Sequence, residues 1–215
     1  MNARDLRWQG LPVPYIAPWS HEHALPGQIV RRRGIGGEGI GYADEYSRVD
    51  RRSGVLWVRQ AIAPGIGSPQ LAGVHSLRQR QAADHMLCQV CGRPTFGRPD
   101  ERHLYVVRSD GRPIQEGEKT TAPPVHEACA RRAVQHCPHL RKGYTAALVG
   151  YSPYWGVAGV VYDPQTLQPL PGDDLELVGY EDPRIRWTLA AQSAVALYEC
   201  ETVNLDELAL TGVAR

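Results

Sequence analysis

The sequence lacks an apolar run long enough to cross a bilayer, and it holds a single Phe among its 215 residues. A spanning helix needs about 20 consecutive apolar residues, and the first ten residues carry arginines with no apolar run behind them. We therefore expect a soluble, cytoplasmic protein with no membrane partner. Five Trp and ten Tyr supply the aromatic mass instead, and these rings prefer places where an N–H or O–H finds a partner.

Cysteine is scarce, and its odd count of five argues against a fully paired disulfide framework. Four of the five fall within positions 88–137, at spacings typical of metal ligands. In a reducing compartment such spacing favours zinc over disulfides. Cys200 stands apart, and we expect it to be a buried, unreactive thiol.

A strong net charge is also missing, since the formal balance is only +1. The charges are nevertheless uneven along the chain. Positions 75–142 hold 12 Lys+Arg against 7 Asp+Glu, whereas the remainder holds 12 against 16. The basic part is therefore the cysteine-bearing part, and either an anionic partner or a solvated basic face accounts for that asymmetry.

No internal repeat and no linker-like stretch divides the chain, and its 22 Gly and 17 Pro indicate many turns and short elements. A length of 215 residues is enough for a sizeable core without cross-links. We expect a single α+β domain over 1–215. It should consist of short antiparallel strands with an embedded zinc-binding unit at 87–141 and a C-terminal helix.

The first third of the chain reads as extended. Three prolines within 11–19 favour a polyproline-like or edge segment. The β-branched or aromatic stretches 27–33, 39–46 and 54–60 are separated by glycine-rich or charged turns, which predicts an antiparallel meander. The glycine run at 34–41 resembles a phosphate-binding loop, but no helix pattern follows it, so a flexible hairpin explains it better.

Both helices and strands are expected around the cysteine region. Apolar residues at near-helical spacing predict a helix over 69–87. After the cysteines, 145–151 and 156–163 read as strands joined by a turn, and 175–180 as another strand. Asp182 followed by Pro183 is a typical helix start, so we predict that 184–200 forms the C-terminal helix.

Cys88-Gln-Val-Cys91-Gly92 is the strongest local signal in the chain. Two thiolates three residues apart can hold one ion when the backbone between them turns tightly, and a following glycine permits the left-handed turn. Such a pair is called a zinc knuckle.

A second pair, His126-Glu-Ala-Cys129, follows two prolines and opens a helical run. Residues spaced i and i+3 on a first helical turn point the same way, and the unpaired N–H groups there favour thiolate charge. Between the pairs lie two expected strands around Asp110-Gly111, a dipeptide that favours a hairpin turn. We predict one structural zinc ion held by Cys88, Cys91, His126 and Cys129.

A knuckle, a hairpin and then a helix bearing the second ligand pair is the order of treble-clef zinc fingers, which the span 87–141 resembles. The wider sequence resembles an uncharacterised family from high-GC bacteria, through its Cys-x-x-Cys-Gly, Pro-Pro-Val-x-x-x-Cys and Cys-Pro-His-Leu motifs. That resemblance implies no known activity, and treble clefs serve many unrelated functions.

Cys137 and His139 are two further candidates for the four ligand positions around the zinc ion. If a helix runs from His126 to His136, Cys137 lies eight residues past Cys129, about 12 Å along the axis. One ion cannot bridge that distance, so we exclude Cys137 from the ligand set. Pro138 should end the helix and leave Cys137 packed beneath it, and the alternative is that Cys137 and His139 belong to a second site. Three thiolates and one imidazole leave no position open for water, which favours a structural role over catalysis.

These features predict a non-catalytic binding protein that contacts nucleic acid or a protein partner through its basic zinc unit. Arginine forks suit phosphate, and Tyr105 would add stacking if it is exposed. The candidate contact residues are Arg93, Arg98, Arg102, Arg108, Arg131, Arg132, Arg141 and Lys142. Aromatic anchors for a protein partner, or alternatively core residues, are Trp8, Tyr15, Trp19, Tyr154 and Trp155.

The enzyme alternative is an HNH-type metal-dependent nuclease, because such nucleases build a catalytic histidine on the same elements and His103 begins the first expected hairpin strand. No Asp-His pair precedes the turn, however, so the non-catalytic reading is favoured. The run Ser20-His21-Glu22-His23 is also rich in functional groups. Neighbours in an extended segment point to alternating sides, so we interpret this run as a polar turn.

Overall fold

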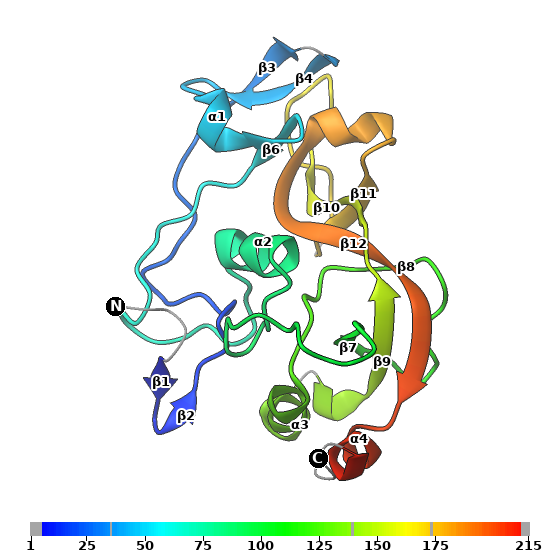
Figure 1. Cartoon of the computed structure of the whole chain (residues 1–215). Coiled ribbons are helices and arrows are strands. Elements are labelled where there is room, and N and C mark those ends of the chain that lie inside the picture. The colour runs from blue at the N-terminus through cyan, green and yellow to red at the C-terminus, as the bar shows by residue number, and fades with distance from the viewer. Residues whose placement is uncertain (1–5, 35, 139, 173, 212–215) are drawn as a thin grey trace.

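One strand of 16 residues, β12 (Thr188–Val203), runs through the middle of the molecule in the computed structural model (Figure 1). The structure describes residues 6–34, 36–138, 140–172 and 174–211. Along one edge β12 pairs antiparallel first with β10 (Tyr154–Val161) and then with β9 (Tyr144–Tyr151). Along the other edge it pairs parallel with β6 (Val55–Trp57) and antiparallel with β8 (Glu118–Thr120).

Further strands extend this mixed, mainly antiparallel sheet to eight strands within the described residues. β11 (Glu176–Gly179) adds to β10, β5 (Arg51–Arg52) to β6, and β7 (His103–Arg108) to β9. Two short hairpins stand apart, β1 (Arg7–Trp8) with β2 (Leu11–Pro12), and β3 (Ile29–Gly34) with β4 (Gly37–Tyr42).

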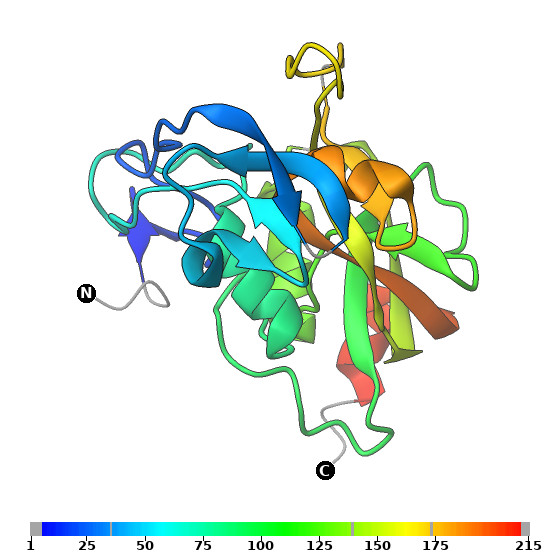
Figure 2. The ribbon, with the colours of Figure 1, turned by 90° about the horizontal axis from the view of Figure 1, so that it is seen from above.

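The helices are short and lie around the sheet. They are α1 (Ser47–Asp50), α2 (Ser76–Asp84), α3 (Glu127–His136) and α4 (Leu205–Thr211), with 3₁₀ turns η1 (Leu140–Lys142) and η2 (Pro183–Trp187). No helix in the described part of the chain is both long and apolar enough to span a membrane. Figure 2 shows η2 beside the β3–β4 hairpin, where an added Cβ on Gly39 would lie 2.4 Å from the Arg186 carbonyl oxygen. Glycine is thus needed there for close packing.

The helix predicted over 184–200 is wrong. Asp182 does cap a helical start, accepting a bond from the Arg184 N–H at 2.8 Å, but only the single turn η2 forms before β12 begins. Five consecutive residues of β12, Ser193–Leu197, are buried, so both faces of the strand are covered there. An apolar run of this kind matches a buried helix equally well. The helix found near the C-terminus is α4, which follows β12.

The strand expectations around 144–161 hold, but their connection differs. β9 and β10 do not pair with each other; they lie in line along the same edge of β12, and the Pro153 carbonyl bonds the Ala196 N–H at 3.0 Å. The third strand of the expected N-terminal meander likewise pairs with β5 and β12 instead of β4. The helix expected over 69–87 is confined to Ser76–Asp84.

Side chains on the β7–β9 part of the sheet alternate between two cores. Leu104 and Leu148 pack with α3 and the cysteine region, whereas Tyr105 and Val149 pack with Leu197 on the opposite face. This period of two is what a sheet buried on both sides requires. The cysteine-bearing unit is therefore docked on one face of the sheet.

A buried ion pair fastens the N-terminal segment to α2. Glu22 is 2% exposed, and Arg78 donates to both of its carboxylate oxygens at 2.7 and 2.6 Å. The same guanidinium bonds the carbonyls of Tyr15 and Ala17. The expected polar turn at 20–23 thus places its carboxylate inside the protein, while His21 and His23 stay exposed.

Replacing Glu22 should destabilise the fold strongly. Glu22→Gln leaves the buried Arg78 charge without a counter-charge, which costs about 3–5 kcal/mol of unfolding free energy, and urea unfolding measures it. A matched control is Glu38→Gln, whose exposed pair with Arg31 is worth about 0–1 kcal/mol. Equal losses in the two variants would contradict a structural role for the buried pair.

Acid should weaken the same contact. Burial alone raises the pKa of the Glu22 carboxyl, but the bonds from Arg78 and the Trp19 N–H outweigh it and hold the pKa below its ordinary value of 4.5. A carboxyl with a lowered folded pKa stabilises the fold above its unfolded pKa and loses this contribution as pH falls through the folded pKa. The stability gap between wild type and Glu22→Gln should therefore shrink below about pH 4.5, as urea unfolding across that range will show.

Candidate metal centre

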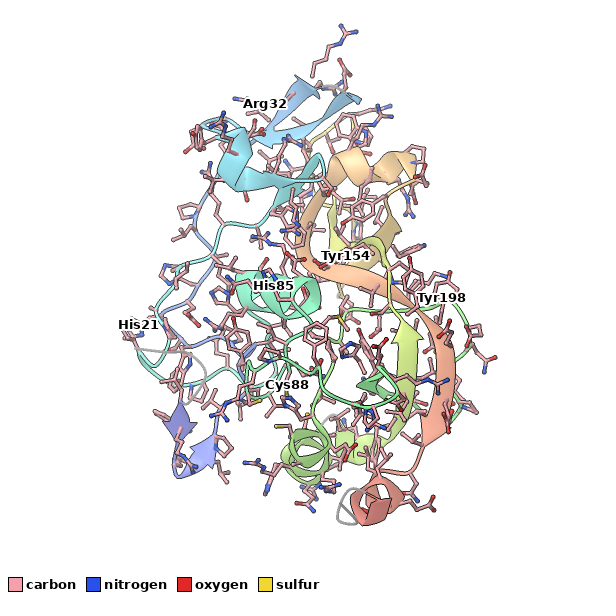
Figure 3. All side chains as sticks on the ribbon, in the orientation of Figure 1. His21, Arg32, His85, Cys88, Tyr154 and Tyr198 are labelled. Atoms are coloured by element: carbon pink, nitrogen blue, oxygen red, sulfur yellow. The ribbon has the colours of Figure 1, made fainter. Side chains whose placement is uncertain are left out.

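Four side chains from two separate segments meet beside the sheet. The ligand atoms of Cys88, Cys91, His126 and Cys129 all lie within 4.8 Å of one another. Sulfurs about 2.3 Å from a tetrahedral ion are about 3.8 Å apart, so this group has the size of a metal site. Cys88 and Cys129 are buried, and Cys88 lies between α2 and α3 in Figure 3.

The first pair sits on a tight turn. The Cys88 N–H bonds the Arg93 carbonyl at 2.8 Å, and the Gly92 N–H bonds the Cys88 carbonyl at 2.8 Å. Gly92 has φ +67°, a left-handed conformation in which glycine carries no Cβ penalty. The turn brings both thiols to the same side, as the Cys-x-x-Cys-Gly pattern predicts.

The second pair opens α3. His126 is the N-cap residue with extended backbone angles, and Cys129 lies on the first turn of the helix. The His126 N–H also points at the Cys88 sulfur, 3.5 Å away. The helix start thus supplies two ligands and a backbone donor to the same centre.

The imidazole of His126 is oriented for ligation. Its Nε2 lies 2.9 Å from the Pro94 carbonyl oxygen, so this nitrogen carries the proton, and its Nδ1 lies 3.3 Å from the Cys91 sulfur. A metal-ligating histidine typically donates its other N–H to a carbonyl or carboxylate, which fixes the tautomer. No spacing rule in the sequence points to the Pro94 carbonyl.

The three cysteine thiols lie so close together that they shift one another's pKa values. The hydrogen bond from the Cys129 thiol is the largest effect lowering the pKa of Cys88 to about 5, against the opposing effect of burial. The same contact, together with burial, raises the pKa of Cys129, and burial raises that of Cys91. Three thiols in one place cannot all ionise without a compensating positive ion, and a bound metal supplies it. This group could hold a metal ion.

Cys137 lies outside this group. It is the C-cap residue of α3, half-buried, with its N–H bonded to the Ala133 carbonyl at 2.8 Å. His139 lies outside the described residues. Cys200 is half-buried at the far end of β12, and its backbone N–H bonds the Glu116 carboxylate.

The strand hairpin expected between the two ligand pairs is not formed. β7 pairs with β9, and β8 pairs with β12, so the two strands flanking Asp110-Gly111 have different partners. Gly111 keeps the left-handed angle of a turn, with φ +95°. Within the described residues the unit therefore lacks the hairpin that the treble-clef order predicts, and the structure does not confirm a treble clef.

Half of the basic residues proposed for partner contact are engaged within the chain. Arg98 pairs with Asp100 and Glu127, and Arg102 with Glu201. The Arg131 guanidinium lies 3.4 Å from the Leu205 carbonyl, and Arg93 is also engaged. Among described residues no carboxylate pairs with the remaining four, which are Arg108, Arg132, Arg141 and Lys142. We name these four the basic end.

Several of the aromatic candidates, and the histidine candidate His103, are buried or held by contacts within the chain. Tyr105 is 1% exposed, which removes the expected stacking surface, and Tyr15 and Trp19 are also buried. His103 is half-buried, and its Nδ1 lies 2.8 Å from the Thr95 hydroxyl. Burial lowers the pKa of His103, and it is not part of the metal-ligand group.

Comparison with known protein families, with curated proteins and with solved structures returned no match. The resemblances drawn from the motifs therefore gain no support from these comparisons.

The ligand set makes a direct prediction for metal content. The purified chain should hold one zinc ion, and Cys129→Ser should lose it and unfold the 87–141 unit, since structural zinc contributes on the order of 10 kcal/mol to folding. Elemental analysis measures the first effect and circular dichroism the second. Cys137→Ser is the matched control from the same helix, and loss of metal in that variant would show that the ligand set is wrong.

Proposed function

We propose that this chain is a zinc-stabilised, non-catalytic binding protein that contacts a protein partner beside its metal unit. The ion is structural, because three thiolates and an imidazole close a tetrahedral sphere. The knuckle and helix follow treble-clef order, and thiolate ligands suit a reducing compartment such as the cytoplasm.

A groove of about 550 Å³ beside α3 carries the proposal. Ligand sites occupy roughly 300–1,000 Å³ and are mainly apolar with a few placed polar groups. Val90, Ala133 and Leu140 line this groove together with Arg108 of the basic end. Arg141 and Lys142 belong to η1, which also contributes Leu140.

These surroundings favour a polypeptide over nucleic acid. Single-stranded nucleic acid binds through stacking on exposed aromatic rings in a basic channel. Tyr105 is buried, and no aromatic side chain is among the described residues that line the groove. Apolar walls next to cations that pair with no carboxylate in the described part of the chain instead suit an acidic polypeptide with some apolar side chains.

Selection from a random peptide display library on the zinc-loaded protein tests this proposal. Selected peptides should be enriched in Asp and Glu, and their affinity should fall as salt rises, because the cations are exposed. The double variant Arg141→Glu/Lys142→Glu should weaken binding about tenfold, which corresponds to about 1.4 kcal/mol.

Arg31→Glu is the control, because this exposed arginine lies on β3, away from the metal unit (Figure 1). It should leave peptide affinity unchanged. If no peptide is selected, while mixed-sequence DNA or RNA binds with a steep salt dependence, the partner is nucleic acid and the proposal is wrong.

A further inference from the structure

The open edge of β7 forms part of the same groove. Val106, Val107 and Arg108 line it from β7, and residues 118–122 line it from the segment that contains β8. Within the described residues β7 pairs with one strand only, β9. Its other edge faces the groove from Val106 to Arg108, whereas at Leu104 that edge is already bonded to the Val125 N–H.

Hydrogen bonding shows which backbone groups point into this space. The N–H and C=O of one residue in an antiparallel strand point to the same side, and successive residues alternate. The Leu104 carbonyl accepts a bond from the Val125 N–H at 2.8 Å, so Leu104 faces away from β9. Val106 and Arg108 share its parity and also face the open edge.

Val106 has unusual surroundings for an edge residue. It is only 5% exposed, yet none of the described residues outside the strand pairing forms a backbone hydrogen bond to it. A buried backbone N–H or C=O is normally paired, because leaving it without a partner costs free energy comparable to a lost hydrogen bond. An added strand would supply both partners.

The charges around the groove indicate what that strand carries. Arg108 lines it from β7 and Lys119 from β8. The one carboxylate among the lining residues, Glu118, is already held by Arg112 at 2.7 Å. The Lys119 ammonium also lies 5.7 Å from the centroid of the Trp155 ring. Two cations against one carboxylate give the groove lining a net positive charge, which complements a negatively charged segment.

We propose that an extended, acidic peptide segment of a partner protein binds in this groove by adding a strand to the open edge of β7. Backbone bonds to Val106 supply affinity, and Arg108 and Lys119 select acidic side chains, as in other strand-addition complexes. This inference rests on the proposed function and specifies how the partner is held.

Peptides that are N-methylated one position at a time test the binding mode on the full-length, zinc-loaded protein. The peptides are those that the display library selects. Strand addition uses the N–H of every second peptide residue, so methylation should weaken binding about tenfold or more at alternate positions only. Amide hydrogen exchange at Val106 should slow about tenfold or more when peptide is bound.

A pair of variants on α3 tests the groove itself. Ala133→Glu places a negative charge among the groove-lining residues and should abolish binding of acidic peptide. Gln135→Glu adds the same charge on the exposed side of α3 and should preserve it. Zinc content confirms that both variants keep the metal unit folded.

The outcomes separate the two proposals. If acidic peptides bind in a charge-dependent way, but N-methylation shows no alternation and Val106 is not protected, strand addition is wrong and the proposed function stands. If no peptide binds at all, the proposed function itself fails. Equal loss in Ala133→Glu and Gln135→Glu would place the peptide outside the groove.

Discussion

Pairing along both edges of β12 is the constraint on which the rest of the structure depends. One edge holds β10 and β9 in line, and the other holds β6 and β8. Since β6 belongs to the N-terminal third and β9 follows the cysteine region, this strand joins segments far apart in the chain. β12 thus connects the end of the molecule that holds the β3–β4 hairpin with the end that holds α3 and the candidate metal centre (Figure 1).

The cysteine-bearing unit and the sheet share one buried core, so each stabilises the other. Cys88 and Cys129 are members of the same buried cluster as Leu104 and Leu148, so the ligands are also core residues. Metal binding in such an arrangement is coupled to packing, because the ligands converge only when the helix and the knuckle are docked. The groove beside β7 has α3 as one of its walls, so an ion bound at this centre would indirectly shape the surface that we assign to a partner.

Many charged side chains of this protein form ion pairs with other residues of the same chain. The Glu22–Arg78 pair fastens the N-terminal segment to α2, and Arg98 and Arg102 are held by neighbouring carboxylates. The basic excess of the segment 75–142 is therefore larger than the number of cations that remain available to contact a partner. The four residues of the basic end, which pair with no carboxylate among the described residues, lie on α3, on η1 and at the end of β7. Their position matters more than the total count of basic residues.

Local patterns in the sequence predicted the four residues of the candidate metal centre, the turn at Cys88–Gly92, the start of α3 and the β3–β4 hairpin, because neighbours within a few residues decide each of these features. Non-local contacts decided the rest. Thr188–Val203 is a strand because neighbours cover both of its edges, and its apolar run alone fits a helix as well. β7 pairs with β9 instead of forming a local hairpin, and Tyr105 on β7 is buried. Glu22 lies in the core, where it pairs with Arg78, which is 56 residues away in the chain. Burial and strand pairing depend on which distant segments meet, and that information exists only in the folded chain.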